Sequence, residues 1–500
     1  MSAGGLISRS WTLKKLEYSL DKADCYSTWK ALAAEHDELS GANQWKQSED
    51  SDLFDARQLK KRFKVLQDAL AENDREEVLF ALNEGIHGNM GGMGKSVLYR
   101  QSRLGTKKLI ENYVATVVEA LQQVGDAPES EIPFDEKLDF FRRASHCYGR
   151  SALTLSGGGG LIYFHHGVVE TLLEHNILPN VISGASAGAW MAAQIGTRTD
   201  AELSEYFQHK RYDFQAGKGL KDIVGLMRGI GRADLENERD DVIDAFVPNL
   251  TFQEAYERTG RYINISIAPV EKHQTSRLMN AITSPNVTIR SAVKASSSVP
   301  GLVDPVELEA KDSRGRTKPY LRSRRWVDGS FAEDLPFKRL ARLFGVNHYV
   351  VSMINPLAAP FLRPESKSGS LSVTNSVKNL AIVGARETLK TGRRWISPVT
   401  LGRFDSMFGV VYQLIEQDYV GDINIVLNRK QVKSGNSLFN YADDADIQAL
   451  ILAGRRATWP RVDQIRNSVQ ISRAIDEILD RLEQEALAQP HPQHKPHMTL

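Results

Sequence analysis

The segment Gly184-Ala185-Ser186-Ala187-Gly188 has the pattern of a serine nucleophile at a tight turn. It follows a short apolar stretch, 179–183, that we expect to be a strand, and it precedes an expected helix at 187–195. Glycines beside the serine allow the backbone to approach its neighbours closely, and the helix N-terminus directs N–H groups toward developing negative charge. The sequence therefore predicts Ser186 as a nucleophile at a strand–turn–helix elbow shaped by Gly184 and Gly188.

A run of four glycines, Gly157, Gly158, Gly159 and Gly160, follows another expected strand at 152–155. Residues without side chains leave their backbone N–H groups bare, so these groups can converge on an anion. Acyl transfer to a serine passes through a tetrahedral oxyanion, and each backbone donor that stabilises it contributes roughly 3–4 kcal/mol. A nucleotide-binding loop does not fit, because Ile162 stands where that motif requires its third glycine. We therefore predict an oxyanion hole at 157–160.

Asp328 ends a further expected strand, 325–328, and Gly329 follows it. The carboxyl end of a strand is where α/β proteins place their reactive groups. Asp-Gly is also a common turn dipeptide, so this pair gains weight only beside the serine and the glycine run.

The order of these elements, a glycine run, G-x-S-x-G and then Asp-Gly, resembles the patatin-like phospholipase family over about 150–353. Ser156 to Gly160 with His166-Gly167-Val168, and the segment 278–301, are similar to the variant in triacylglycerol lipases of fungi and plants. Leu98-Tyr99 and the segment 102–107 resemble the helical domain that precedes the patatin-like domain in those lipases. The resemblance covers most of residues 10–430.

This resemblance implies a Ser–Asp dyad in which Asp328 is the general base for Ser186, with no cofactor or metal. It implies hydrolysis of fatty-acyl esters in lipid catabolism, with triacylglycerol as the first substrate and glycerophospholipid as the alternative. The storage-protein version of the motif has a basic residue after the glycine run, whereas Leu161 and Ile162 stand here, so any such charge comes from elsewhere. Two other interpretations stay open: a Ser186–Asp328–His348 triad, and a non-catalytic protein that binds lipid surfaces.

Strands and helices alternate over 149–355, which predicts a three-layer α/β/α domain with a mainly parallel sheet. Residues 1–148 carry apolar side chains at helical spacing and predict an N-terminal helical domain. We expect a mixed C-terminal extension at 356–487, which includes an amphipathic helix over 463–487, and a disordered tail at 488–500.

The chain has 500 residues with 63 Lys and Arg against 62 Asp and Glu, which gives no reason to expect nucleic acid as a partner. Two cysteines, Cys25 and Cys147, are too few for a disulfide framework and favour a reducing compartment. We expect no secretory signal and find no run of ~18–20 apolar residues. These features predict a cytoplasmic protein that meets a membrane or lipid droplet at its surface, with the basic segment 311–325 as one candidate contact.

Overall fold

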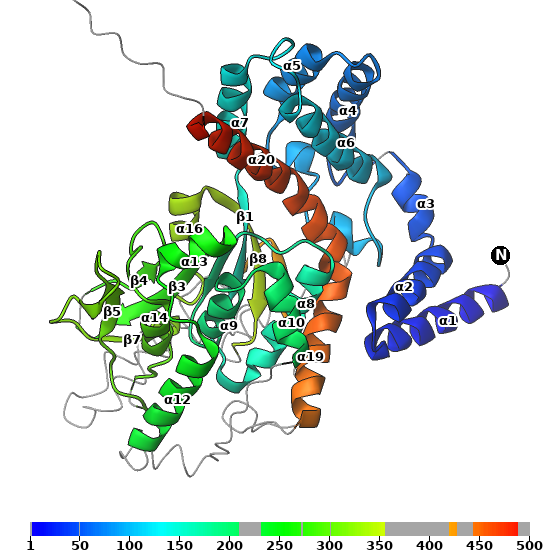
Figure 1. Cartoon of the computed structure of the whole chain (residues 1–500). Coiled ribbons are helices and arrows are strands. Elements are labelled where there is room, and N and C mark those ends of the chain that lie inside the picture. Colours follow the sequence, from blue (N-terminus) through cyan, green and yellow to red (C-terminus); the bar gives the residue numbers. More distant parts are fainter. Residues whose placement is uncertain are drawn as a thin grey trace, which may run out of the picture. The chain divides into compact units, whose positions relative to one another are not determined.

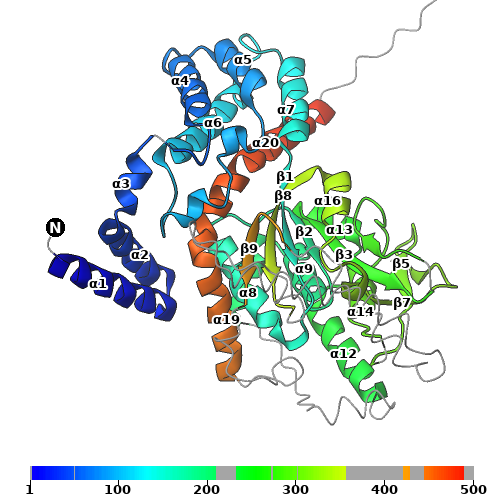
Figure 2. The same cartoon turned by 180° about the vertical axis from the view of Figure 1, so that it is seen from behind.

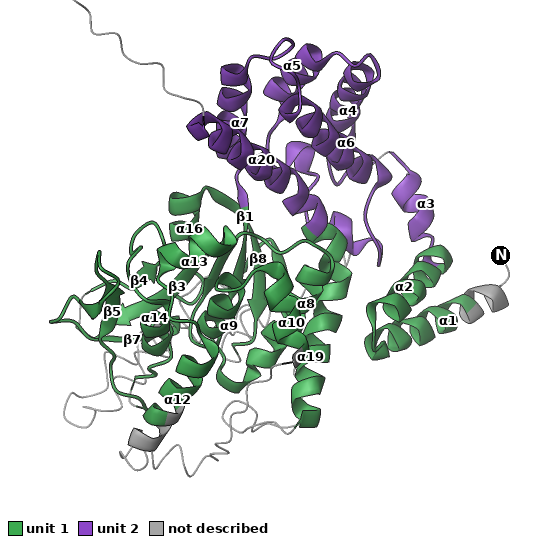
Figure 3. Ribbon diagram, in the orientation of Figure 1, with its two compact units in different colours: residues 1–39, 151–465 green, residues 40–150, 466–500 purple. Residues whose placement is uncertain are grey.

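The computed structural model describes residues 3–49, 51–209, 232–271, 274–300, 302–355, 420–427 and 444–488 (Figure 1, Figure 2). The chain forms two compact units: the first contains residues 1–39 and 151–465, and the second contains 40–150 and 466–500 (Figure 3). Each unit is therefore built from segments far apart in the sequence. The expected domain boundaries at 148/149 and 355/356 remain predictions. Most of the expected extension, at 356–419 and 428–443, and the tail from 489 lie outside the described residues.

A mostly parallel sheet organises the first unit, as the alternation of expected strands and helices predicts. Its strands have the order β4-β3-β2-β1-β8-β9, and β7 also pairs with β3. Parallel registers join β1 to β2, β2 to β3 and β8 to β9, whereas β4 and β7 are antiparallel to β3. The strands are β1 (Arg150–Leu155), β2 (Val181–Gly184), β3 (Tyr262–Pro269), β4 (Arg277–Met279), β7 (Trp326–Asp328), β8 (Val346–Met353) and β9 (Ile423–Val426). A separate hairpin pairs β5 (Leu308–Lys311) with β6 (Thr317–Tyr320).

Helices cover both faces of this sheet, which confirms the predicted three-layer α/β/α arrangement. On one face, Leu340 and Phe344 of α16 (Phe337–Phe344) are buried, and the Phe344 ring centroid lies 4.9 Å from that of Tyr262 in β3. On the other face, Gly196 of α9 (Ala187–Gly196) lies so close that an added Cβ would be 1.9 Å from the Ile263 side chain. Because consecutive strand residues point to opposite faces, these contacts place α16 and α9 in different layers.

The first two helices of the chain belong to the same unit as the sheet. The rings of Tyr26 and Trp29 each lie 6.3 Å from that of Trp459, and Arg456 donates to the carbonyls of Lys22 and Ala23.

None of the helices in the described ranges is both long and apolar enough to cross a bilayer. Besides α9 and α16, the α-helices described in this unit are α1 (Ala3–Lys22), α2 (Tyr26–Ser40), α8 (Ile162–Glu174), α10 (Asp200–His209), α12 (Arg232–Phe246), α13 (Phe252–Thr259), α14 (Ile289–Ser296), α15 (Ser330–Glu333) and α19 (Asp444–Thr458).

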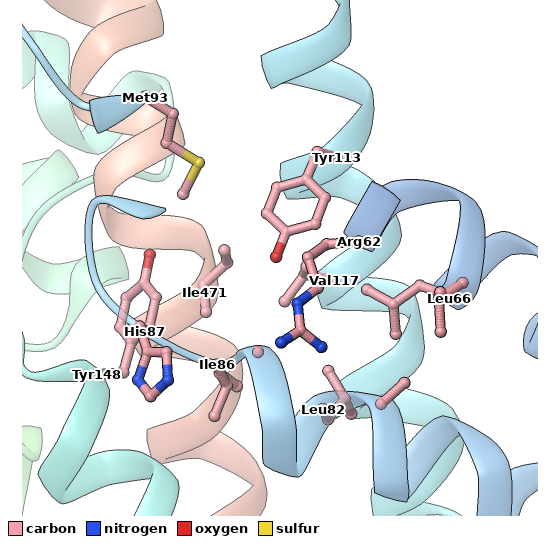
Figure 4. Close-up of a pocket in the computed structure, with 13 residues that line it drawn as sticks. Arg62, Leu66, Leu82, Ile86, His87, Met93, Tyr113, Val117, Tyr148 and Ile471 are labelled. Atoms are coloured by element: carbon pink, nitrogen blue, oxygen red, sulfur yellow. The ribbon is translucent and has the colours of Figure 1, made fainter. Parts of the chain in front are cut away.

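The second unit is helical and has its own core, as the helical spacing before residue 148 predicts. The expected helix at 463–487 is confirmed as α20, and its Ile471 and Ile475 are buried in one cluster with Val117 and Phe141. Residues of this unit line a small pocket that includes Arg62 (Figure 4), and none of the residues predicted to do chemistry lines it. The helices are α3 (Ala42–Gln47), α4 (Ala56–Ala71), α5 (Arg75–Gly85), α6 (Lys108–Gly125), α7 (Phe134–Tyr148) and α20 (Val462–Ala488).

A buried lysine connects the conspicuous segment 102–107 to the start of this unit. The side chain of Lys107 is fully buried, and its Nζ donates to the carbonyl oxygens of Trp45 at 2.7 Å and Ser48 at 2.8 Å. The same ammonium lies 4.5 Å from the centroid of the Trp45 ring. A buried ammonium needs such acceptors, because it has lost its water. The neighbouring Lys108 is 59% exposed and forms an ion pair with Glu111.

We expect Lys107→Met to lower the free energy of unfolding by about 2–3 kcal/mol, because it removes hydrogen bonds made by a buried charge. Urea unfolding of the full chain measures the change. The matched control is Lys108→Met, which removes the same charge from an exposed position and should change the free energy by less than about 1 kcal/mol. Equal effects of the two substitutions would show that the Lys107 contacts do not stabilise the unit.

Candidate active site

The meeting point of two strands on one edge of β3 brings the predicted nucleophile and carboxylate together. Ile265 pairs with Gly184 of β2 and with β4, and Ile267 pairs with Asp328 of β7 and again with β4. A strand can pair along only two edges, and β4 occupies one edge of β3. Strands β2 and β7 therefore both pair along the other edge, where the end of β2 meets the end of β7. Asp328 therefore lies two positions beyond Gly184 along β3, about 6–7 Å at strand spacing.

Ser186 occupies the sharp turn that the sequence predicts. Its backbone has φ 53° and ψ −119°, a conformation that is rare for a residue with a side chain and that stores strain. The turn is held because the Ser186 N–H donates to Ser296 Oγ at 2.9 Å, and that hydroxyl donates to the Ser266 carbonyl at 2.8 Å. Ser186 is only partly buried, whereas its neighbours on both sides are buried. The strained turn thus presents the hydroxyl at the surface of the sheet edge.

The two glycines of the elbow are required by close backbone packing. A Cβ on Gly184 would lie 2.1 Å from the Gly188 carbonyl oxygen, and a Cβ on Gly188 would lie 2.1 Å from that of Leu155. Neither position has room for a side chain. The G-x-S-x-G pattern therefore reflects contact between the elbow, the following helix and the end of β1.

Asp328 is buried, and one of its two carboxylate oxygens lacks a hydrogen-bond donor among the described residues. Its Oδ1 accepts from the Ser330 N–H at 2.8 Å, whereas Oδ2 completes no hydrogen bond with the described residues. Burial raises the pKa of Asp328 to about 6, while the N–H and the side chain of Ser330 and the hydroxyl of Ser186 lower it. The Ser186 hydroxyl is therefore close enough to stabilise the Asp328 carboxylate, although the two groups do not form a well-aligned hydrogen bond. Gly329 lets this segment pass β3, because a Cβ there would lie 2.3 Å from the Ser266 carbonyl carbon.

The glycine run lies beside the nucleophile, but one of its four predicted donors is occupied. A Cβ on Gly157 would lie 3.3 Å from Ser186 Cβ, and the Gly157 N–H donates to Asp334 Oδ1 at 2.8 Å. The N–H groups of Gly158 and Gly159 donate to no residue in the described part of the chain. Gly159 and Gly160 are exposed. The donors open to an oxyanion are therefore those that follow Gly157.

Asp334 is a second buried carboxyl of this site that the sequence analysis missed. Its Oδ1 accepts from Gly157, and its Oδ2 accepts from Asn355 Nδ2 at 3.3 Å. Burial and, to a smaller extent, the nearby charge of Asp328 together raise the pKa of Asp334 to about 7, against the lowering effect of these two donors. No local pattern marks Asp334, because its partner Gly157 lies 177 positions earlier in the chain.

A buried histidine and serine fix the start of the glycine run. His165 Nε2 donates to the Ser156 carbonyl at 2.9 Å, and Nδ1 accepts from Ser352 Oγ at 2.7 Å. Burial lowers the pKa of His165 to about 4, so the ring is neutral near neutral pH. Ser156 Oγ accepts from the Ile354 N–H at 2.9 Å and donates to the Gly157 carbonyl at 3.2 Å. These contacts fix the loop to the end of β8.

His348 lies apart from the nucleophile. Its Nδ1 is 3.3 Å from the hydroxyl of Ser151, the second residue of β1, whereas the glycine run follows Leu155 at the other end of that strand. Four residues of strand separate the two positions by about 13 Å. Burial lowers the pKa of His348, against the nearby charge of Asp422. The geometry therefore gives no support to a triad through His348.

The assembled groups have the elements of nucleophilic acyl transfer: a partly exposed serine, a buried carboxylate that interacts with it, and loop N–H groups that donate to no described residue. No cluster of three or more His, Cys, Asp or Glu side chains suited to a metal is found among the described residues.

Two family models match the chain in succession. One, described as a domain of unknown function (DUF3336), matches residues 6–146, and the other, described as patatin-like phospholipase, matches residues 153–341.

Three named relatives align with nearly the whole chain. Triacylglycerol lipase SDP1L of Arabidopsis thaliana is 34% identical, over 86% of this chain and 54% of its own length. Triacylglycerol lipase 4 of Saccharomyces cerevisiae is 30% identical over 95% of this chain and 54% of its own length. Triacylglycerol lipase ptl2 of Schizosaccharomyces pombe is 30% identical over 93% of this chain and 75% of its own length. The chain thus spans about half the length of the first two.

We expect Asp334→Ala to slow covalent labelling of Ser186 by a fluorophosphonate about 10²-fold, because the loop beside the nucleophile loses the acceptor that holds it. Asp334→Asn keeps an oxygen acceptor for the Gly157 N–H and should retain most of the labelling rate. The rates are compared by in-gel fluorescence, and urea unfolding checks that both variants are folded. If the alanine variant is labelled as fast as the wild type, Asp334 does not position the loop.

Proposed function

The chain belongs to the patatin-like phospholipase family, and from this premise we propose that it is a serine acyl hydrolase that cleaves fatty-acyl ester bonds of triacylglycerol. The observation that supports the proposal is the interaction of partly exposed Ser186 with buried Asp328, whose Oδ2 accepts no hydrogen bond from the described residues. A carboxylate makes an adequate general base only when its pKa is raised toward the working pH, and burial has this effect on Asp328.

In the proposed reaction, Ser186 Oγ attacks the ester carbonyl carbon while its proton passes to Asp328 Oδ2. The tetrahedral intermediate collapses, the bond to the alcohol breaks, and Asp328 returns the proton to the leaving alkoxide. Water then attacks the acyl-enzyme, gives a proton to Asp328, and the bond to Ser186 breaks. The fatty acid leaves and Ser186 regains its proton, so the enzyme is unchanged.

The negative charge of each intermediate needs donors at the carbonyl oxygen. The N–H groups of Gly158, Gly159 and Gly160 are the proposed donors, supported by the N-terminus of α9, which begins next to Ser186. Leu161 and Ile162 supply no cation after the glycines, so backbone dipoles carry this task in the proposal.

Triacylglycerol is the proposed substrate because three relatives of this chain are named triacylglycerol lipases. Phospholipase A-type hydrolysis of glycerophospholipids is the second candidate, and the patatin-like phospholipase description of the matching family model favours it. The third candidate is a non-catalytic protein that binds lipid surfaces, which would release no fatty acid from either lipid.

Such substrates aggregate in water, so we propose that the chain works as a peripheral protein at a membrane or lipid droplet in the cytoplasm. Cys25 and Cys147 are free thiols, which is compatible with a reducing compartment.

We expect Ser186→Ala and Asp328→Asn each to reduce fatty-acid release by at least about 10³-fold, because one removes the nucleophile and the other its base. The purified wild type and variants are assayed in parallel on emulsified triacylglycerol and on phospholipid vesicles. The lipid from which the wild type releases fatty acid and both variants do not is then the substrate class that the dyad hydrolyses. His348→Asn is the control and should retain activity.

Three outcomes contradict parts of this proposal. Activity that survives in Asp328→Asn but not in Ser186→Ala excludes Asp328 as the base. Loss of activity in His348→Asn to the same extent as in Ser186→Ala restores the Ser186–Asp328–His348 triad. No release from either lipid by the wild type favours the non-catalytic alternative.

We also expect kcat/KM to rise with pH through an apparent pKa of about 6 and then to level off. Only the ionised form of Asp328 accepts the serine proton, so the rate should fall about tenfold for each pH unit below that pKa. Ser330→Ala is the comparison, because it keeps the backbone N–H that donates to Asp328 Oδ1 but removes the side-chain hydrogen bond that lowers the pKa of Asp328, so the acid limb should move to higher pH. A rate that does not change on the acid side contradicts a carboxylate base.

A further inference from the structure

One face of helix α1 carries two exposed aromatic rings and two lysines in a regular pattern. Trp11 and Tyr18 are 67% and 65% exposed, and Lys15 and Lys22 are exposed as well. At 3.6 residues per turn these four positions fall within a sector of about 60°. We call these four residues the α1 face; they lie on the helix labelled α1 in Figure 1.

Each aromatic ring of the α1 face is paired with the lysine one turn later. Lys15 Nζ lies 5.8 Å from the centroid of the Trp11 ring, and Lys22 Nζ lies 5.6 Å from that of Tyr18. The pair therefore repeats after seven residues, with the cations above the rings. No acidic residue falls within the sector, since Glu17 is directed toward His36 of α2 and Asp21 lies about 90° away.

The opposite side of α1 holds the helix to its unit, so the exposed face is not a frayed end. Leu16 and Leu20 are buried, and the carbonyl of Lys22 accepts from Arg456 at 2.8 Å. The α1 face is thus presented by a helix whose other side is packed. Substitutions at the exposed positions should leave the fold intact.

Aromatic side chains with a polar tip, flanked by long cationic side chains, fit the boundary between lipid head groups and acyl chains. Trp and Tyr place their rings among the acyl carbons and their N–H or O–H in the polar layer. Lysine stems lie along the apolar surface while the ammonium reaches anionic head groups. We infer that the α1 face is a docking surface for an anionic lipid–water interface.

The basic hairpin that the sequence also suggests as a contact is less suited to this task. Asp312 forms ion pairs with Arg316 and with Lys318 at 2.8 Å, and Arg325 forms one with Glu307 at 3.4 Å. Much of its charge is therefore matched within the protein. The lysines of the α1 face are directed at aromatic rings instead.

Lipid docking through α1 rests on the proposed function, but it is tested by measuring vesicle binding and not by measuring hydrolysis. The full chain is co-sedimented with phosphatidylcholine–phosphatidylserine vesicles and with pure phosphatidylcholine vesicles. One variant carries Trp11→Ser and Tyr18→Ser, and a second carries Lys15→Gln and Lys22→Gln. The controls are Phe80→Ser, an exposed aromatic ring on α5, and the double variant Lys61→Gln, Lys64→Gln, which makes the same charge change on α4.

We expect the aromatic variant to lose at least about tenfold in partitioning to mixed vesicles, since it removes the apolar contact. The lysine variant should lose roughly 30-fold on mixed vesicles, at about 1 kcal/mol for each charge, and little on pure phosphatidylcholine. Both controls should bind like the wild type.

The inference is overturned if the wild type does not bind mixed vesicles, or if the two α1 variants bind as tightly as their controls. It is also overturned if the aromatic variant only lowers the self-associated mass in analytical ultracentrifugation, because a second copy then covers the face. Ser186→Ala should bind vesicles like the wild type. Normal binding without any hydrolysis by the wild type sinks the proposed function and leaves this inference standing.

Discussion

Strand β2 ends at Gly184, and the edge of β3 that it leaves free is taken by β7 from the opposite direction. Two more residues of β2 would fill the edge at Ile267, which is where Asp328 pairs. The tight turn at Gly184 therefore has two effects: it raises Ser186 above the sheet, and it clears the edge on which the carboxylate sits. The antiparallel direction of β7 makes Asp328, its last residue, the one nearest to the turn. The chemistry proposed here depends on this shared edge more than on any single side chain.

The same arrangement makes the site a source of instability at neutral pH. Burial raises the pKa of Asp328 and Asp334 from 3.8 to about 6 and about 7. Between the unfolded and folded values the folded chain binds more protons than the unfolded chain, so stability falls as pH rises through this range. The strained backbone of Ser186 adds a further cost. Hydrogen bonds from Ser330, Gly157 and Asn355 to the two carboxyl groups offset part of this loss of stability. The remainder must be offset by the rest of the fold.

Features that depend on residues close together in the sequence could be predicted, whereas features that depend on contacts between distant residues could not. The elbow at Ser186 and the glycine run are local patterns, because tight turns demand particular residues within five positions. Asp328 carried little local information and was identified through the resemblance, since Asp-Gly occurs in many turns. Asp334 has no local signal at all, because its role arises from a contact with Gly157 across 177 positions. The joining of residues 1–39 to the unit of the sheet likewise depends on contacts such as Trp29 with Trp459, which no periodicity reveals.

The raised pKa of Asp334 also bears on how a glycine loop without a neighbouring cation can stabilise an oxyanion. In the proposed attack the site keeps one negative charge, which moves from Asp328 to the substrate oxygen as the proton moves the other way. A second ionised carboxylate beside the loop would oppose that movement, because Asp334 accepts from the Gly157 N–H next to the proposed donors. With its pKa raised to about 7, Asp334 carries its proton in a large share of molecules near neutral pH. Burial therefore lets one side chain anchor the loop while placing little charge against the oxyanion, which a solvated aspartate at the same position could not do.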